Sequence, residues 1–149
     1  MKDIFLDFDD TITCIECEPV WDEDLGLWCH KQMLKNNVNN FLKFLTDNFN
    51  VFWCSFNSNK NIRERLKDVV DKDILNKIPY FNCCKYGFSN KVAEINEISK
   101  NYIFIDDSFC IEEQKLISEE CLFIQACETD MEDLVKIETE IREKLKMRT

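Results

Sequence analysis

The sequence predicts an α/β fold in which a mostly parallel sheet carries helices on both faces. Apolar runs of strand length alternate along the chain with stretches of helical periodicity, an order typical of parallel sheets. The runs 51–54 and 103–105 are apolar throughout, and 4–8 is apolar except for Asp7, as expected of strands covered on both faces. No repeat and no linker rich in proline, glycine or serine divides the chain, so we expect residues 1–149 to form one domain.

The expected strands cover apolar runs, and most of the expected helices repeat their apolar residues near helical spacing. The expected strands are 3–8, 50–55, 79–83, 102–106 and 121–125. The expected helices are 38–48, 60–70, a short one at 72–77, 90–99, 111–117 and 130–147. Residues 12–36 show neither period, and we expect them to be irregular. The last helix repeats apolar residues near helical spacing among charged ones, which predicts that they pack on the core. They are Met131, Leu134, Val135, Ile137, Ile141 and Leu145.

Charge and composition narrow the class of partner. The formal net charge of −10 argues against a nucleic-acid backbone as the main partner, since such binding needs clusters of Lys and Arg, although a local basic patch would still permit it. No apolar run is long enough to cross a membrane. The first residues, Met1, Lys2 and Asp3, lead directly into a strand without the apolar stretch of a signal peptide. We therefore expect a cytoplasmic protein without a membrane partner.

The nine cysteines are expected to be mostly reduced thiols, because disulfides are rare in cytosolic proteins. One group suggests a metal site: Cys14, Cys17, Cys29 and His30 offer the donors of tetrahedral zinc. Their spacing is irregular and no second Cys-x-x-Cys follows. Zinc binding by these four residues is therefore left open.

Polar residues that could bind a metal or take part in a reaction follow several of the expected strands. Asp7 and Asp9 end the first strand, Ser55 ends the second, and Asp106 and Asp107 end the strand at 102–106. The carboxyl ends of parallel strands lie at one edge of a sheet, where ligands bind in open α/β folds. Burying unpaired carboxylates is costly, so they are retained where they bind a metal or take part in chemistry. Clustered carboxylates at such an edge suit Mg²⁺.

A lysine completes this set. Lys91 opens the helical stretch that precedes the strand at 102–106 and would reach the same edge of the sheet. Lys60 is a rival, because it also follows Ser-Asn at an expected helix start. We prefer Lys91 for its place one helix before the acidic strand.

The order Asp-x-Asp, Ser, Lys, acidic pair resembles the motif order of the haloacid dehalogenase (HAD) phosphohydrolases. The resemblance spans residues 7 to 107 and implies a three-layer, Rossmann-like fold. It implies that Asp7 attacks phosphorus to form an aspartyl-phosphate and that Asp9 acts as general acid and base. Thr11, the last residue of the first motif, is included among the candidate phosphate-binding residues, although tying the turn after the strand is its favoured use.

The same resemblance assigns the remaining residues to phosphate and metal. Ser55 and Lys91 would bind the phosphoryl oxygens. Mg²⁺ would be held by Asp7, by the backbone carbonyl of Asp9 and by Asp106, with Asp107 supporting the site. An Asp9 in this motif favours hydrolysis of a phosphate ester, because an oxygen leaving group needs a proton.

The chain has no room for the cap domain of larger HAD enzymes. Residues 12–37 leave space only for a turn and a minimal flap, and 56–90 only for short elements. Capless relatives often act on macromolecules, or close the site with a second subunit, so an oligomer stays open. Trp21, Leu27 and Trp28 are expected to pack the flap against the core, with a substrate mouth as their alternative use.

Proteins of other functional classes carry similar residues. A phosphorelay receiver domain would place its acidic pair first, and here Ser55 and Lys91 precede Asp106 and Asp107. A non-catalytic binding or regulatory protein on a HAD scaffold, or a phosphatase of nucleic-acid ends, remains an alternative to a phosphatase of small phosphate monoesters. The sequence does not identify the phosphorylated substrate, which is either a small molecule or a macromolecular end.

Overall fold

A computed structural model describes residues 1–15, 18–30, 32–85 and 90–148. Its centre is a parallel sheet of four strands. Their order in space differs from their order along the chain, so crossover connections join them. The strands are β1 (Asp3–Leu6), β6 (Asn50–Trp53), β7 (Tyr102–Asp106) and β8 (Leu122–Gln125), in the spatial order β6-β1-β7-β8. Every neighbouring pair is parallel. The predicted α/β class with a parallel sheet is therefore confirmed.

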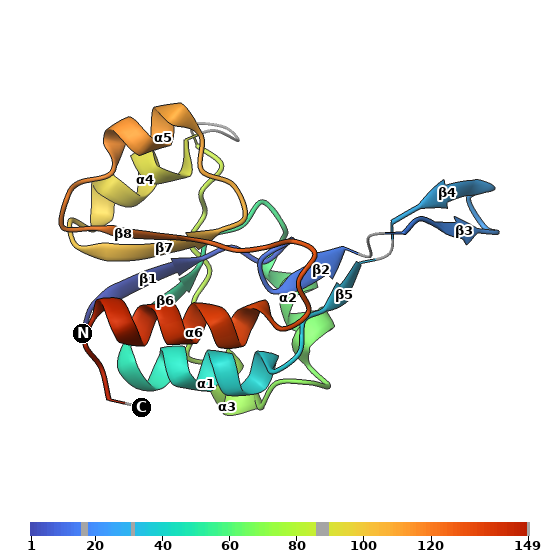
Figure 1. Ribbon diagram of the computed structural model, residues 1–149, viewed down its shortest axis with the longest axis horizontal. Coiled ribbons are helices and arrows are strands. Elements are labelled where there is room, and N and C mark those ends of the chain that lie inside the picture. Colours follow the sequence, from blue (N-terminus) through green and yellow to red (C-terminus); the bar gives the residue numbers. More distant parts are fainter. Residues whose placement is uncertain (16–17, 31, 86–89, 149) are drawn as a thin grey trace.

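Helices cover both faces of this sheet (Figure 1). One face carries α4 (Lys91–Ile98) and α5 (Ile111–Leu116). The opposite face carries α1 (Val38–Asn48) and α6 (Asp133–Lys144), with α2 (Asn59–Leu66) and α3 (Lys72–Leu75) on the same side. Among the described residues no helix is long and apolar enough to cross a membrane.

The two faces of the sheet are packed with different side chains, because successive strand residues point to opposite faces. Ile4 and Leu6 face α1 and α6 in a mainly aliphatic core. Phe5 faces α4, and it belongs to a row of phenylalanines across all four strands. The register pairs Phe5 with both Phe52 and Phe104, and Phe104 with Phe123. This packing fixes the register of the strands and hence the positions of the loops that follow them.

Most predicted elements are found, with shorter ends. Helix 38–48 has the predicted bounds, whereas helix 60–70 ends at Leu66 and helix 130–147 is confined to Asp133–Lys144. The predicted strand 79–83 is wrong: a single parallel bridge joins Tyr80 to Trp53. Pro79 has no N–H to donate, so only its carbonyl, which accepts from Trp53, extends the pairing on that side.

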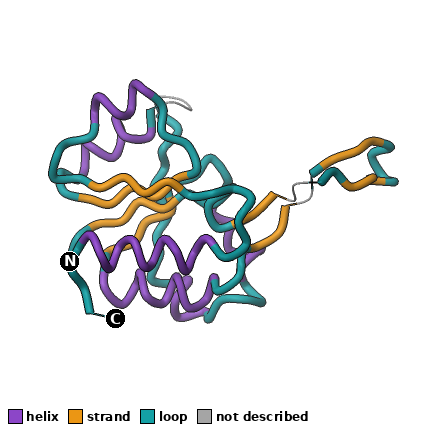
Figure 2. Tube along the Cα trace, viewed as in Figure 1, coloured by secondary structure: helices purple, strands orange, loops and turns teal. Residues whose placement is uncertain are grey.

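The predicted irregular region 12–36 is also corrected, because it forms two antiparallel ribbons. The strands β2 (Thr13–Ile15) and β5 (Gln32–Leu34) pair close to the sheet, and β3 (Val20–Asp22) pairs with β4 (Leu27–Cys29) farther out. We call β3, β4 and their connecting turn the distal hairpin; it extends away from the sheet in Figures 1 and 2. Sequence periodicity cannot reveal such strands, because three residues are too few to show an alternation.

The distal hairpin exposes large apolar side chains. Trp21 and Trp28 lie opposite each other on the two strands, with their ring centres 5.5 Å apart, and they are 47% and 65% exposed. Leu27 is 47% exposed. The expectation that these three residues pack the flap against the core is therefore wrong.

Candidate active site

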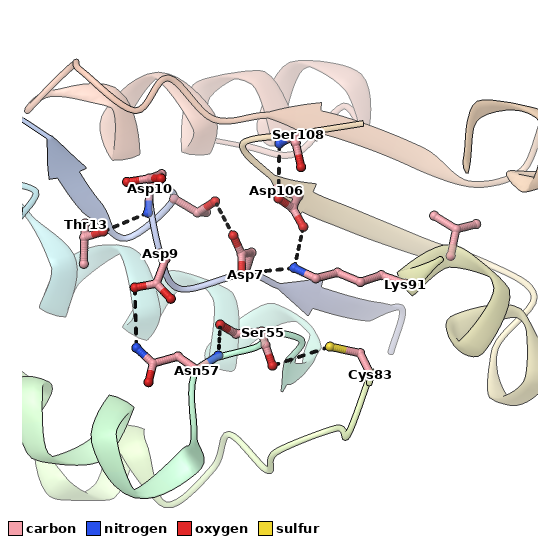
Figure 3. Close-up of polar contacts among 12 residues, drawn as sticks. Asp7, Asp9, Asp10, Thr13, Ser55, Asn57, Cys83, Lys91, Asp106 and Ser108 are labelled. Carbon is pink, nitrogen blue, oxygen red and sulfur yellow. Dashed lines mark hydrogen bonds and ion pairs between the residues drawn. The ribbon is translucent and has the colours of Figure 1, made fainter. Parts of the chain in front are cut away.

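The candidate site lies where β1, β6 and β7 end. Asp7 directly follows β1, Ser55 lies two residues beyond β6, and Asp106 is the last residue of β7. Lys91, the first residue of α4, reaches the same place (Figure 3). Parallel pairing of the three strands brings their carboxyl ends to one edge, so the sheet itself positions these side chains.

Lys91 lies between two buried carboxylates. Its Nζ is 2.8 Å from Oδ2 of Asp106 and 3.1 Å from Oδ1 of Asp7. The side chains of Lys91, Asp7 and Asp106 are only 7%, 7% and 3% exposed. One ammonium thus faces two carboxylates, and the group keeps an excess negative charge in a place that water hardly reaches.

This charge imbalance shifts the pKa values of the buried groups. Burial, with the neighbouring charge of Asp106, raises the pKa of Asp7 well above its ordinary value in spite of Lys91. Burial acts to lower the pKa of Lys91, but the charges of Asp7 and Asp106 outweigh it and raise that pKa. Lys91 is therefore a permanent cation, while a charged Asp7 is destabilised unless a further cation approaches.

Asp107 adds a third carboxylate. Oxygen atoms of Asp7, Asp106 and Asp107 lie within 4.8 Å of one another, which is the spacing of ligands around one metal ion. Burial, together with the adjacent Asp106, raises the pKa of Asp107 to about 7. Asp106 itself is fixed by the backbone N–H of Ser108, which donates to its Oδ1 at 3.1 Å. The donor set is all oxygen, as Mg²⁺ prefers.

Asp9 points to the loop after β6 and not into this triad. Its Oδ1 accepts a hydrogen bond of 3.4 Å from the side-chain amide of Asn57. The backbone N–H of Asn57 donates to Oγ of Ser55 at 3.1 Å. Since Ser55 Oγ accepts from Asn57, its own proton is available to a ligand in the cavity. The hydroxyl of Tyr80 lies 2.9 and 3.0 Å from the carbonyl oxygens of Ser55 and Asn57 and holds this loop.

Thr11 lies behind Asp7. Its hydroxyl is 3.4 Å from Oδ2 of Asp7, and the residue is fully buried. The carbonyl of Phe8 accepts from the N–H groups of Thr11, Ile12 and Thr13, so the chain turns sharply after β1. The geometry thus gives Thr11 contact with the carboxylate of Asp7 and a place in the turn.

The site opens into a cavity of about 240 Å³. The cavity is lined by the predicted residues Asp7, Asp9, Ser55, Lys91, Asp106 and Asp107, and by Asp10, Phe56, Ser108 and Glu113. Phe56 and Asn57 were missed by sequence reasoning. The ring centre of Phe56 is 4.9 Å from Nζ of Lys91. The positions of both residues directly after Ser55 could have indicated that they lie near the site. Glu113 comes from α5 and carries no such signal.

Two other predicted groups lie elsewhere. Lys60 lines a separate cavity between α2 and α3, so Lys91 and not Lys60 is the lysine at the strand ends. Of the proposed zinc donors, Cys14 is buried in β2 and Cys29 lies in β4, while Cys17 is outside the described residues. Within the described ranges, the groups of three close metal-binding side chains are Asp7, Asp106 and Asp107, and Asp10, Asp107 and Glu128. Zinc binding stays a prediction.

The chain matches no protein-family model and no curated protein. Inference about its function therefore depends on the site's geometry and on the motif order of the sequence.

Proposed function

We propose that this protein is a Mg²⁺-dependent phosphatase that hydrolyses a phosphate monoester through an aspartyl-phosphate on Asp7. One observation carries the proposal: Asp7 lies at a strand end, 3.1 Å from the buried ammonium of Lys91 and beside the carboxylates of Asp106 and Asp107. A nucleophile is thus placed between one cation and a set of oxygen ligands for another. The order of these residues along the chain, which resembles that of HAD phosphohydrolases, supports the same conclusion.

The donor set fits Mg²⁺. Asp7, Asp106 and Asp107 would hold it, and the excess negative charge around Lys91 gives a physical reason for a further cation at this point. When bound, Mg²⁺ would offset negative charge on the phosphoryl group and orient it for in-line attack. Asp9 would contribute its backbone carbonyl, since its carboxylate is engaged with Asn57.

The residues then divide the reaction between them. A carboxylate oxygen of Asp7 forms a bond to phosphorus while the bond from phosphorus to the leaving oxygen breaks. Asp9 donates a proton to that leaving oxygen and later accepts one from the water that attacks the aspartyl-phosphate. The second step releases inorganic phosphate and restores both carboxyl groups. Lys91 and the hydroxyl of Ser55 stabilise the phosphoryl oxygens during both steps.

Mg²⁺-dependent release of phosphate from p-nitrophenyl phosphate tests the proposal. The wild type is expected to turn over and Asp7→Asn to be inactive. Asp68→Asn, which removes an exposed carboxylate that does not line the cavity, is expected to leave turnover unchanged. Beryllofluoride, which mimics an acyl phosphate on aspartate, should bind the wild type and not Asp7→Asn, as followed by ¹⁹F NMR. A wild type that neither releases phosphate nor binds beryllofluoride with Mg²⁺ would instead favour a non-catalytic binding protein.

A further inference from the structure

The wall of the candidate active site contains a buried carboxylate that the proposed reaction does not use. Glu113, in the first turn of α5, is only 4% exposed and lines the cavity together with Lys91 and Asp106. A buried carboxylate is costly unless hydrogen bonds compensate for the water that it has lost. The hydrogen bonds of Glu113 therefore indicate what it does.

These hydrogen bonds connect α5 with the start of α4. Oε2 of Glu113 accepts from the backbone N–H of Val92 at 3.3 Å, and Oε1 accepts from the thiol of Cys110 at 3.4 Å. Val92 is the second residue of α4, so its N–H is one of the first four that have no acceptor within the helix. A negative charge at this end of a helix also suits the helix dipole. Glu113 thus caps α4, although it belongs to a different helix.

The capped N–H belongs to the peptide group that joins Lys91 to Val92. Glu113 therefore holds the backbone at the point from which the side chain of Lys91 departs. That side chain extends into the site, where its Nζ lies 2.8 Å from Asp106 and 3.1 Å from Asp7. A lysine side chain is a flexible stem of four carbons, so the position of its ammonium depends on where the backbone holds the base of the stem.

A second contact between the two helices lies away from the site. The side-chain amide of Asn96, one turn further along α4, donates to the carbonyl of Leu116 at the end of α5 at 3.0 Å. Neither Asn96 nor Leu116 lines the cavity. Thus α5 holds α4 at both points, and the contact made by Glu113 is the one next to Lys91. This allows the positioning of Lys91 to be separated experimentally from the packing of the helices.

We propose that Glu113 is a positioning residue of the candidate active site. By accepting from Val92 it fixes the start of α4, and this keeps the ammonium of Lys91 between the carboxylates of Asp7 and Asp106. Both carboxylate oxygens of Glu113 are engaged with the protein, so it acts through Lys91 and not on the phosphoryl group. The effect on turnover rests on the proposed phosphatase activity, whereas the effect on Lys91 can be measured without it.

Two substitutions separate the reach of this side chain from its charge. Glu113→Ala removes the acceptor, and Glu113→Gln keeps an oxygen at the same reach but removes the charge. Hydrogen exchange at the Val92 amide should be at least about tenfold faster in Glu113→Ala, because hydrogen bonds to charged groups are among the strong ones. The ammonium signal of Lys91 in ¹H–¹⁵N NMR spectra should shift, and its protons should exchange faster with water. Glu113→Gln should stay close to the wild type in both respects, since its side-chain oxygen can accept from the same N–H.

Two control variants show whether a loss of stability alone gives the same result. Asn96→Ala removes the other contact between α4 and α5, and Glu112→Ala removes an exposed carboxylate from the same turn of α5. Urea unfolding measures the stability of every variant. Asn96→Ala is expected to lose stability, yet the Lys91 signal of both controls should match that of the wild type.

Turnover of p-nitrophenyl phosphate in Mg²⁺ is the second readout. Glu113→Ala should lower kcat/KM by about 10- to 100-fold, because a displacement of about 1 Å can remove most of the effect of a positioned group. Glu113→Gln should lose less, and both controls should be unchanged. If the wild type has no phosphatase activity but the Lys91 signal moves in Glu113→Ala, the proposed function fails and the positioning role stands.

A Glu113→Ala variant with the wild-type exchange rate at Val92 and the wild-type Lys91 signal would overturn the inference. So would a Glu113→Gln variant that loses as much as Glu113→Ala, because reach and not charge is the proposed property. If Glu113→Ala does not fold, Glu113→Asp takes its place in the same comparison. Its carboxylate is one methylene shorter and should lose the contact with Val92 in the same way.

Discussion

The side-chain amide of Asn57 donates to the carboxylate of Asp9 at 3.4 Å and joins the loop after β6 to the loop after β1. Asn57 also donates its backbone N–H to Ser55, and its carbonyl lies 3.0 Å from the hydroxyl of Tyr80. One residue thus connects the proposed acid and base with a proposed phosphate-binding residue. In the proposed reaction we assign Asn57 a positioning role, because it contacts both Asp9 and Ser55.

Asn57→Ala is expected to slow turnover by roughly three- to tenfold, since a typical hydrogen bond contributes about 0.5–1.5 kcal/mol. The loss should be larger for an alkyl phosphate than for p-nitrophenyl phosphate, because only the alkyl leaving group needs proton donation from a well-placed Asp9. The measurement is kcat for a series of leaving groups. Asn82→Ala, which removes a side-chain amide from a loop outside the cavity, is the control. An equal loss for all leaving groups would contradict a role through Asp9.

Substitutions of Asp7 and of Asp9 are expected to impair the proposed reaction in different ways. Asp7→Asn removes the attacking oxygen and a metal ligand together, so no phosphoenzyme should form. Asp9→Asn keeps the backbone carbonyl but loses the proton donor, and should lower kcat by about 10²–10⁴-fold. Beryllofluoride should therefore bind Asp9→Asn as it binds the wild type, whereas Asp7→Asn should not bind it. Near wild-type turnover by Asp7→Asn would show that the nucleophile is assigned to the wrong residue.

Much of the fold could be predicted because the sheet and its covering helices have strong periodic patterns. Helix 38–48 is found at its predicted bounds, and the apolar strands around Phe5, Phe52 and Phe104 pair in parallel. The segment 79–83 has a strand-like composition, yet it forms a single bridge, because strand formation there depends on a partner edge and on the missing N–H of Pro79. The two short ribbons and the exposure of Trp21 and Trp28 could not be predicted either. Both depend on which segments meet in the folded chain, and composition does not record this.

The clustering of the site followed from topology more than from motifs. Strand ends alone predict that Asp7, Ser55 and Asp106 meet, and the structure places them around one cavity. Asn57 and Phe56 could not be predicted, because their orientation depends on how the loop after β6 is held by Tyr80. The sequence favours Lys91 over Lys60 by its place one helix before the acidic strand, and the structure puts Lys91, not Lys60, at the cavity.

An open site should accept bulky substrates. The distal hairpin extends away from the sheet, so among the described residues no domain covers the cavity. We expect kcat/KM for a phosphopeptide or a 3′-phosphorylated oligonucleotide to be at least comparable to that for a small sugar phosphate. The comparison should be made at several protein concentrations, so that any closure of the site by a second subunit would be noticed. A strong preference of the monomer for the smallest substrate would contradict an open site.

Lys91 is expected to be required for folding as well as for activity. Lys91→Met keeps the unbranched stem of the side chain but leaves Asp7 and Asp106 buried without a cation. Breaking a buried ion pair in this way costs about 3–5 kcal/mol. Urea unfolding in EDTA measures the loss. Lys115→Met, on the exposed part of α5, should change the free energy of unfolding by less than about 0.5 kcal/mol. Equal stability of the two variants would show that Lys91 does not compensate the buried carboxylates.

Asp7→Asn should have the opposite effect on stability when no metal is present. Burial and Asp106 raise the pKa of Asp7 above 3.8, so the folded protein binds that proton more tightly than the unfolded chain. The wild type therefore loses stability as the pH rises from about 4 toward the raised pKa, and the amide removes this loss. In EDTA near neutral pH, Asp7→Asn should melt at least about 2–4 °C higher, which corresponds to about 1 kcal/mol. Mg²⁺ should raise the Tm of the wild type and not that of the variant, because only the wild type has the complete ligand set. If Asp7→Asn melts lower than the wild type in EDTA, Lys91 must balance both carboxylates, and the argument for a further cation at this site fails.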